Sequence, residues 1–296
     1  MPVAPADTVT LKLGHSPDPD DAFMFYALTH EPPLVEAGRW RFDHVLQDIQ
    51  TLSKRAQAGE LELTAISVAS YPLVADKYAL TSCGSSMGDG YGPRLVAREP
   101  MTLDDLRSKK LKIAVPGTLT SAFLSCQLCL GKAGEAFDYE VVMFDEIPEA
   151  VLGKQADVGL LIHEGQLTYA DMGLHLIQDL GVWWQERTGL PLPLGGNCVR
   201  KDLDDLYGEG SMREVTRVLR DSIQYSLDHR DVSVAHSLKY GRGLDHQLAD
   251  EFVGMYVNDW TIDYGARGRE AIRRFLAEGT DKGYIAMQGE VEFVEP

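Results

Sequence analysis

Three aspartates stand within four positions of the segment SPDPDD, residues 16–21, directly behind an apolar run. Carboxylates in such a place can cap a helix, bind a metal ion or take part in acid–base chemistry. The spacing favours capping, with Asp18 at the N-cap, Pro19 at the first helical position, and Asp20 and Asp21 beside the positive end of the helix dipole. The sequence offers no further set of ligands, so we expect no metal. The aspartates can still border a cleft, because α/β proteins bind ligands at the carboxyl ends of their strands.

A second candidate is His163, which ends the apolar segment VGLLIHE at residues 158–164. Histidine exchanges its proton near pH 6.5, so it can act at neutral pH without a large pKa shift. Most histidines at strand ends are structural, but a position on the cleft side favours a role in chemistry. His15 also ends an apolar segment and has less support. His163 is therefore the better candidate for catalysis.

A helix start follows a second strand in the segment PGTLTSAFL, residues 116–124. Gly117 lets the backbone turn, and Thr120 or Ser121 begins the helix. Free N–H groups at a helix N-terminus, together with two hydroxyl groups, can bind a carboxylate or a phosphate. An ordinary N-cap explains the same residues, so both interpretations stay open.

Two patterns are similar to cofactor motifs but lack their context. Cys126 and Cys129 form a C-x-x-C inside the apolar run SAFLSCQLCL, where no helix start lowers a thiol pKa and no second ligand pair is available for zinc. The glycines of GDGYGP, residues 88–93, precede a strand, whereas a dinucleotide fingerprint opens a helix. We therefore expect structural cysteines in a reducing cytoplasm and no nucleotide binding at the glycine-rich segment, which is expected to be a turn or a crossing.

The elements that position these residues alternate between strand-like and helix-like segments over the first two-thirds of the chain. This pattern is typical of parallel or mixed sheets flanked by helices, and a mostly helical return follows from about residue 204. Strands are expected at 9–15, 40–46, 61–67, 93–99, 111–117, 139–144 and 158–164. Helices are expected at 21–30, 49–59, 68–77, 102–108, 121–134, 147–155, 213–227, 246–257 and 269–279. The predicted fold class is therefore α/β.

Two α/β cycles with a helical return predict two lobes with a ligand cleft between them. Residues 1–95 and 197–296 are expected to form a larger, discontinuous lobe, and residues 96–196 a smaller one. The glycine- and proline-rich segments at 88–93 and 189–196 are the expected crossings between the lobes.

Charge and hydropathy limit the partners. The 296-residue chain has a formal net charge of −17, which argues against nucleic acid and anionic membrane as partners. No apolar run approaches the roughly 20 residues of a spanning helix. The start of the chain shows no basic and apolar export signal, so a cytoplasmic location is expected. The oligomeric state is not defined by these features.

Five segments along most of residues 10–200 carry a family resemblance. They are S-P-x-P-x-D-x-F-x-F-Y-A-L (16–28), G-x-G-x-G-P (88–93), V-P-G-x-x-T-(S/T)-A (115–122), G-L-(L/I)-I-H-E (159–164) and D-L-G-x-W-W-x-E-R-T-G-L-P-L-P-L-G (179–195). Together they resemble the menaquinone-biosynthesis family of the futalosine pathway, which contains 1,4-dihydroxy-6-naphthoate synthase and chorismate dehydratase. The last two segments are specific to the synthase branch.

The resemblance implies a two-lobed fold of the type II periplasmic-binding-protein kind. It also implies a lyase that cleaves cyclic dehypoxanthinyl futalosine, a small-molecule carboxylate, to 1,4-dihydroxy-6-naphthoate without a metal or an organic cofactor. The family's general base corresponds to His163. Its substrate-binding groups correspond to Ser67, Thr120 and Ser121.

Three positions depart from the family pattern. Asp18 and Asp20 replace a cysteine and an asparagine, and Ala65 replaces a lysine. Asp18 and Asp20 are expected to border the substrate, where they would lower the local charge. The alternatives are a non-catalytic solute-binding protein of the same fold, which the missing export signal disfavours, and chorismate dehydratase, which the I-H-E and W-W-x-E-R-T-G segments disfavour.

Overall fold

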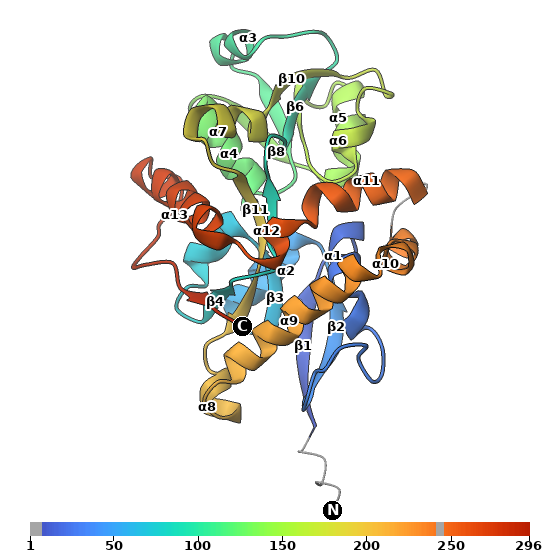
Figure 1. Cartoon of the computed structure of the whole chain (residues 1–296). Helices are drawn as coiled ribbons and strands as arrows, with labels where there is room; N and C mark the ends of the chain where they lie inside the picture. Colours follow the sequence, from blue (N-terminus) through green and yellow to red (C-terminus); the bar gives the residue numbers. More distant parts are fainter. Residues whose placement is uncertain (1–7, 241–245) are drawn as a thin grey trace, which may run out of the picture.

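The computed structural model describes residues 8–240 and 246–296, which form two β-sheets flanked by helices (Figure 1). In these residues the larger sheet has seven strands in the order β12-β4-β11-β3-β1-β2, with β5 paired to β11. The smaller sheet has five strands in the order β10-β6-β9-β7-β8. Both sheets contain parallel and antiparallel pairs. The predicted α/β class with mixed sheets is confirmed.

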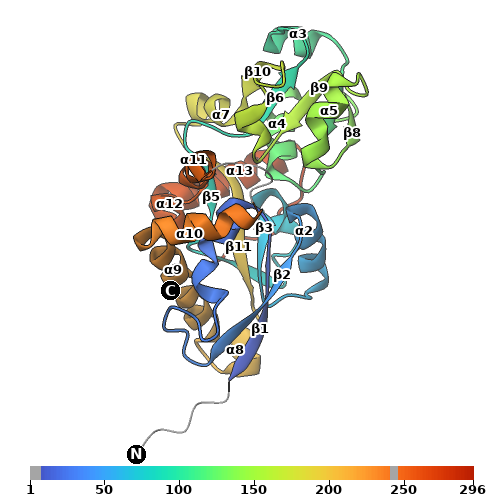
Figure 2. The same ribbon diagram turned by 90° about the vertical axis from the view of Figure 1, so that its right-hand side faces the viewer.

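The two sheets draw on different parts of the chain. The strands of the larger sheet are β1 (Val9–His15), β2 (Trp40–Leu46), β3 (Leu63–Ser67), β4 (Tyr78–Thr81), β5 (Ser86–Gly88), β11 (Leu192–Arg200) and β12 (Phe293–Val294). Those of the smaller sheet are β6 (Arg94–Ala97), β7 (Lys112–Val115), β8 (Asp138–Val141), β9 (Val158–Leu161) and β10 (His175–Asp179). Figures 1 and 2 show the smaller sheet stacked end to end on the larger one.

The helices cover both sheets and the junction between them. The α-helices are α1 (Pro19–Met24), α2 (Ile49–Ala58), α3 (Leu103–Ser108), α4 (Ser121–Leu130), α5 (Ile147–Leu152), α6 (Gly165–Thr168), α7 (Leu180–Thr188), α8 (Leu203–Tyr207), α9 (Ser211–Asp228), α10 (Arg230–Ser237), α11 (His246–Tyr256), α12 (Asp259–Ile262) and α13 (Gly265–Asp281). The 3₁₀ helices are η1 (Tyr26–Leu28), η2 (Val68–Leu73), η3 (Phe144–Glu146) and η4 (Leu238–Tyr240). The expected helical return after residue 204 is confirmed.

Two predicted helices differ from the structure. The helix expected over 21–30 is divided into α1 and η1 at Phe25, whose backbone leaves the helical region. The helix expected over 68–77 is the 3₁₀ helix η2, which contains Pro72. Proline removes a backbone donor and opposes a regular α-helix.

The prediction missed strand β11, which lies in the middle of the larger sheet. The first five residues of its sequence LPLGGNCVR belong to the segment 189–196 that was expected to be a crossing, and proline and glycine are rare inside strands. The strand tolerates Pro193 because the pairing of β11 with β5 is irregular between Pro193 and Gly195. Beyond that point β11 pairs with β3 and β4. Strands β4, β5, β10 and β12 were also not predicted.

One hydrophobic cluster extends across the junction between the sheets. It contains Ile66 and Leu80 from the larger sheet and Val115 and Leu160 from the smaller sheet. Trp184 of α7 belongs to the same cluster, is fully buried, and donates from Nε1 to the carbonyl of Pro191 at 3.1 Å. The two sheets therefore share a continuous core.

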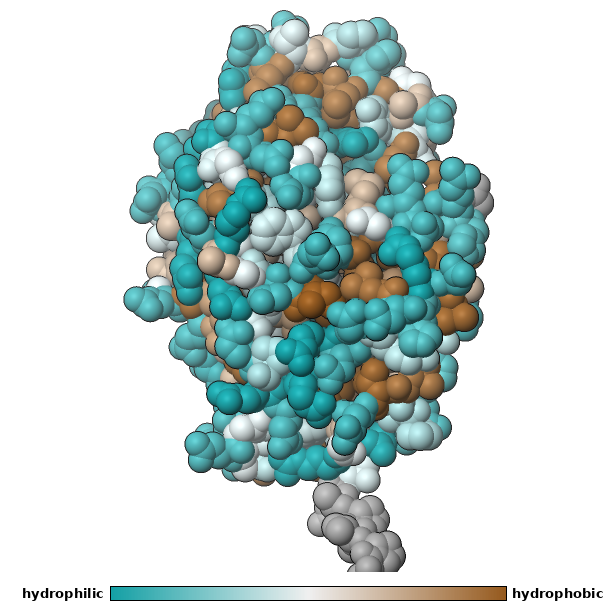
Figure 3. Space-filling view, viewed as in Figure 1, coloured by the Kyte–Doolittle hydropathy of each residue, from teal (hydrophilic) through white to brown (hydrophobic). Residues whose placement is uncertain are grey.

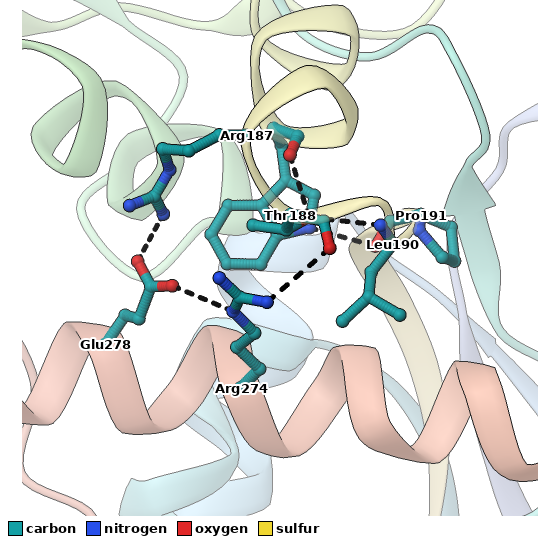
Figure 4. A network of polar contacts seen from close by, with 7 residues as sticks. Arg187, Thr188, Leu190, Pro191, Arg274 and Glu278 are labelled. Atoms are coloured by element: carbon teal, nitrogen blue, oxygen red, sulfur yellow. Dashed lines mark hydrogen bonds and ion pairs between the residues drawn. The ribbon is translucent and has the colours of Figure 1, made fainter.

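A polar network joins α7 to α13 on the outside of this core (Figure 4). Arg187 of α7 pairs with Glu278 of α13, and Glu278 also accepts a hydrogen bond from Nε of Arg274 at 3.1 Å. Arg274 in turn donates to the carbonyl of Thr188 at 3.5 Å. The segment that precedes β11 is therefore attached to the C-terminal helix.

The surface seen in Figure 3 is mostly hydrophilic, and its apolar residues form small separate areas. Among the described residues, no helix combines the length and apolar character that crossing a membrane requires.

Candidate active site

One cavity brings together five of the six residues predicted to form the site. It is lined by Asp20, Ser67, Thr120, Ser121 and His163. Ser67 ends β3, and the other four residues follow β1, β7 and β9. The carboxyl ends of these strands meet where the two sheets face each other. The cavity is thus formed by both sheets, as a cleft between two α/β units requires.

His163 follows strand β9 in a constrained backbone conformation. Its φ is +52°, a region that residues other than glycine rarely adopt. Its ring lies edge-on to Phe144 with the centroids 4.7 Å apart, and Nε2 lies 3.4 Å from Oδ2 of Asp18. The His163 side chain is 19% exposed, so one side of the imidazole stays accessible to the cavity.

Asp18 occupies the predicted N-cap position but does not cap the helix. Its backbone is extended and Pro19 follows at the first helical position, yet within the described structure its carboxylate makes no capping hydrogen bond. The carboxylate faces the imidazole of His163 instead, and Asp18 is not among the residues that line the cavity. The capping prediction is wrong because this carboxylate is turned toward a neighbouring element.

Asp20 and Asp21 are both buried beside the cavity, with 8% and 7% of their surfaces exposed. Oδ2 of Asp21 accepts a hydrogen bond from the backbone N–H of Ser16 at 2.7 Å. Burial, followed by the neighbouring carboxylates Asp21 and Asp18, raises the pKa of Asp20 well above its ordinary value. Burial also raises the pKa of Asp21, against the effect of the Ser16 hydrogen bond. The segment thus carries less negative charge than its sequence suggests.

Thr120 is the N-cap of helix α4. Its Oγ1 accepts a hydrogen bond from the N–H of Phe123 at 3.1 Å and donates to the carbonyl of Gly117 at 2.8 Å. The hydroxyl is therefore already engaged with the protein, as an ordinary cap is.

Ser121 links helix α4 to the larger sheet. Its N–H donates to Oγ of Ser67 at 2.9 Å. Its hydroxyl accepts from the N–H of Ala69 at 3.1 Å and donates to the carbonyl of Leu194 at 2.6 Å. Ser67 and Ser121 thus fasten the helix start to segments on the opposite side of the cleft.

Replacing Ser121 with alanine is expected to lower the free energy of unfolding by about 1–3 kcal/mol, because buried backbone groups of Ala69 and Leu194 lose their partner. Ser125→Ala is the matched control, since the Ser125 hydroxyl donates within α4 to the carbonyl of Ala122 at 2.8 Å. Urea denaturation of both variants measures the difference. Equal losses in the two variants would contradict a link across the cleft.

Gln166 and Tyr256 complete the cavity and were not predicted from the sequence. With its amide oriented to satisfy both ends, Gln166 donates to the carbonyl of Gly92 at 2.6 Å and accepts from the N–H of His163 at 3.2 Å. The same amide contacts the hydroxyl of Tyr256 in α11 at 2.7 Å. Gln166 therefore connects the His163 backbone to the C-terminal helices.

No lysine or arginine lines the described part of the cavity. Ala65 lines it where the family pattern has lysine. The described residues also contain no group of three or more histidine, cysteine or acidic side chains placed to hold a metal ion. An anionic ligand would thus rely on hydroxyls, backbone N–H groups and the dipole of α4.

His15 does not take part in this site. It is buried, and its Nε2 lies 2.9 Å from Nδ1 of His44. Burial and the neighbouring His44 lower the pKa of His15 to about 3. His15 does not line the cavity.

Comparison with known proteins gives consistent family matches. Residues 11–281 match the model of a family described as menaquinone biosynthesis. A 1,4-dihydroxy-6-naphtoate synthase of Thermus thermophilus is 38% identical over 280 residues, which cover 93% of this chain and 96% of that protein. The corresponding Streptomyces coelicolor protein of the same name is 34% identical, covering 95% and 96% of the two chains.

Solved structures agree with the fold. A crystal structure of an Archaeoglobus fulgidus protein is 41% identical, with a TM-score of 0.85 and coverage of 93% of this chain and 98% of the other. The alkanesulfonate-binding protein of Xanthomonas axonopodis pv. citri is only 14% identical, with a TM-score of 0.70 and 97% of each chain covered. This second likeness concerns the fold alone and confirms the predicted periplasmic-binding-protein architecture.

Proposed function

Because this chain belongs to the menaquinone-biosynthesis family, we propose that it is a 1,4-dihydroxy-6-naphthoate synthase that cleaves cyclic dehypoxanthinyl futalosine. Two synthases are similar to it over 96% of their own lengths. The observation that carries the proposal is the position of His163, which lines the cavity between the sheets with its imidazole against a buried carboxylate.

In the proposed reaction His163 is the general base. Ring cleavage begins when a base removes a proton from a sugar hydroxyl, so that this oxygen becomes a carbonyl as the adjacent carbon–carbon bond breaks. The electron pair of that bond leaves with the other fragment, which takes up a proton. A neutral imidazole accepts such a proton near neutral pH. No cofactor is required for this step.

Asp18 is proposed as the residue that positions His163. A carboxylate beside one ring nitrogen fixes the orientation of an imidazole and stabilises the imidazolium that proton transfer creates. Because Nε2 faces Asp18 at 3.4 Å, we assign the proton transfer to Nδ1. The positive φ of His163 agrees with a backbone held in place for function.

The substrate carboxylate is assigned to the start of helix α4. Ser67, Ser121 and Ala122 line the cavity there, at the positive end of the helix dipole. Because the Thr120 and Ser121 hydroxyls are bonded to the protein, they contribute by holding this helix start in place.

We further propose that the sheets define two lobes, with residues 1–95 and 197–296 in the larger and 96–196 in the smaller. We also propose that the protein acts in the cytoplasm. The substrate is bound between the lobes.

The test is to incubate the purified protein with cyclic dehypoxanthinyl futalosine and to analyse the mixture by mass spectrometry. We expect 1,4-dihydroxy-6-naphthoate to accumulate with repeated turnover. Tight binding without conversion would instead indicate a solute-binding protein of the same fold. Loss of water from chorismate, tested in parallel, would indicate the chorismate dehydratase branch.

A further inference from the structure

We propose that Asp20 is a neutral carboxyl group that donates its proton in a hydrogen bond to an oxygen atom at the sugar end of the substrate. This inference deepens the proposed function and rests on it. It assigns a role to an acidic side chain that otherwise opposes the binding of an anion.

The contacts of the three aspartates single out Asp20. Asp18 faces His163, and Asp21 accepts the Ser16 N–H at 2.7 Å. For Asp20, Oδ2 has the hydroxyl of Ser86 at 3.5 Å, and the buried Oδ1 has no hydrogen-bond partner within the described structure. Of these three carboxyl groups, Asp20 has the weakest contacts with groups that would stabilise an ionised carboxylate.

Most of the surroundings of Asp20 favour its neutral form. Asp18 and Asp21 place like charges on the same helix start, and burial is the largest cause of the raised pKa of Asp20. His163, from the smaller sheet, and the backbone N–H of Asp21 act in the opposite direction. Tyr256, from α11, stays neutral because burial raises its pKa. With no lysine or arginine on the described cavity wall, protonation is the available way to reduce the repulsion.

A neutral carboxyl group has a hydrogen to donate. A carboxylic acid kept neutral by its site can serve as a hydrogen-bond donor at neutral pH. Asp20 lines the cavity, and its unpartnered Oδ1 is buried. The matching ligand group is an acceptor oxygen, such as the carbonyl that forms on the sugar.

The strand register separates Asp20 from the carboxylate position. In the larger sheet Gly195 of β11 pairs with Ser67 of β3 on one side and with Ser86 of β5 on the other. Ser67 contacts the start of α4, whereas Ser86 contacts Asp20. Two strand spacings put these positions about 10 Å apart. A ligand that reaches both is therefore elongated, with its carboxylate at α4 and its sugar beside Asp20 and His163.

Infrared spectroscopy tests the protonation without any ligand. The wild type is expected to show the carbonyl stretch of a protonated carboxyl group at neutral pH. Asp20→Asn is expected to show a weaker band, because Asp21, whose pKa burial also raises, can contribute the remainder. Asp43→Asn, which alters an exposed residue of β2, is the control and should retain the band. Absence of the band in the wild type, or a band of undiminished intensity in Asp20→Asn, would overturn the inference.

Steady-state kinetics tests the hydrogen bond. Asparagine is isosteric with a neutral aspartic acid and keeps a donor, so at neutral pH Asp20→Asn should lose less kcat/KM than Asp20→Ala, which has no donor. The wild type should lose activity at alkaline pH by about tenfold per unit once Asp20 ionises, and Asp20→Asn should not show this limb. Asp20→Ala should raise KM roughly tenfold. An alkaline limb that is unchanged in Asp20→Asn would contradict the proposal.

The infrared and kinetic experiments distinguish a failure of this inference from a failure of the proposed function. A wild type whose infrared band weakens in Asp20→Asn but which never converts the substrate would refute the synthase assignment and the sugar contact, and leave the neutral Asp20 established. An active wild type without the band would refute the role of Asp20 and leave the synthase assignment intact.

Discussion

The substitution His163→Asn is expected to lower kcat by roughly 10²–10⁴-fold, the usual contribution of a general base. Asparagine keeps a polar side chain of similar reach but cannot accept the proton. The contacts of the His163 backbone, including the one with Gln166, remain available in the variant. Product affinity should therefore change little. Turnover assays and product titration of the same preparations measure both quantities.

A matched control is His175→Asn, which changes an exposed histidine of β10 that does not line the cavity. This variant should retain wild-type turnover. Near wild-type turnover in His163→Asn would exclude His163 as the base. Loss of product binding in parallel with turnover would show that the imidazole acts in binding.

The elements that carry the site could be predicted because local pattern and tertiary structure agree there. Strands β1 and β2 have the predicted residue ranges, and helix α2 ends at the predicted Gly59, whose φ is +72°. Strand β11 could not be predicted in this way. Its stability comes from hydrogen bonds to β3, β4 and β5, which are distant in sequence, and these override the low strand propensity of its glycines and prolines.

The members of the site could be predicted better than their contacts. Asp20, Ser67 and His163 line one cavity because the carboxyl ends of neighbouring strands meet at one edge. The direction of the Asp18 carboxylate could not be predicted, because local spacing supports a cap and only the position of β9 brings an imidazole within 3.4 Å. Tyr256 lies far along the chain in a helix that the sequence marks only as amphipathic.

The contact between Asp18 and His163 leads to the last prediction. Asp18→Asn is expected to lower kcat by roughly tenfold to a hundredfold, because the amide neither stabilises the imidazolium nor fixes the ring in one tautomer. A carboxylate beside an imidazole favours the protonated form. Its removal leaves the imidazole neutral down to lower pH, so the acid limb of the kcat/KM profile should also move to lower pH.

The lower kcat together with the shifted acid limb distinguishes a role of Asp18 in positioning His163 from a role in packing. Asparagine matches the volume of the 2%-exposed Asp18 side chain, and Asp18 makes no capping bond in the described structure, so the free energy of unfolding should not fall through loss of a cap. Asp43→Asn, in the strand that pairs with β1, serves again as the control for loss of one negative charge. A variant whose activity falls equally at all pH values, with the acid limb in place, would assign Asp18 to packing. A variant with a lowered plateau and a shifted limb would establish that the carboxylate acts through His163, since a packing defect has no reason to move the titration of a proton acceptor.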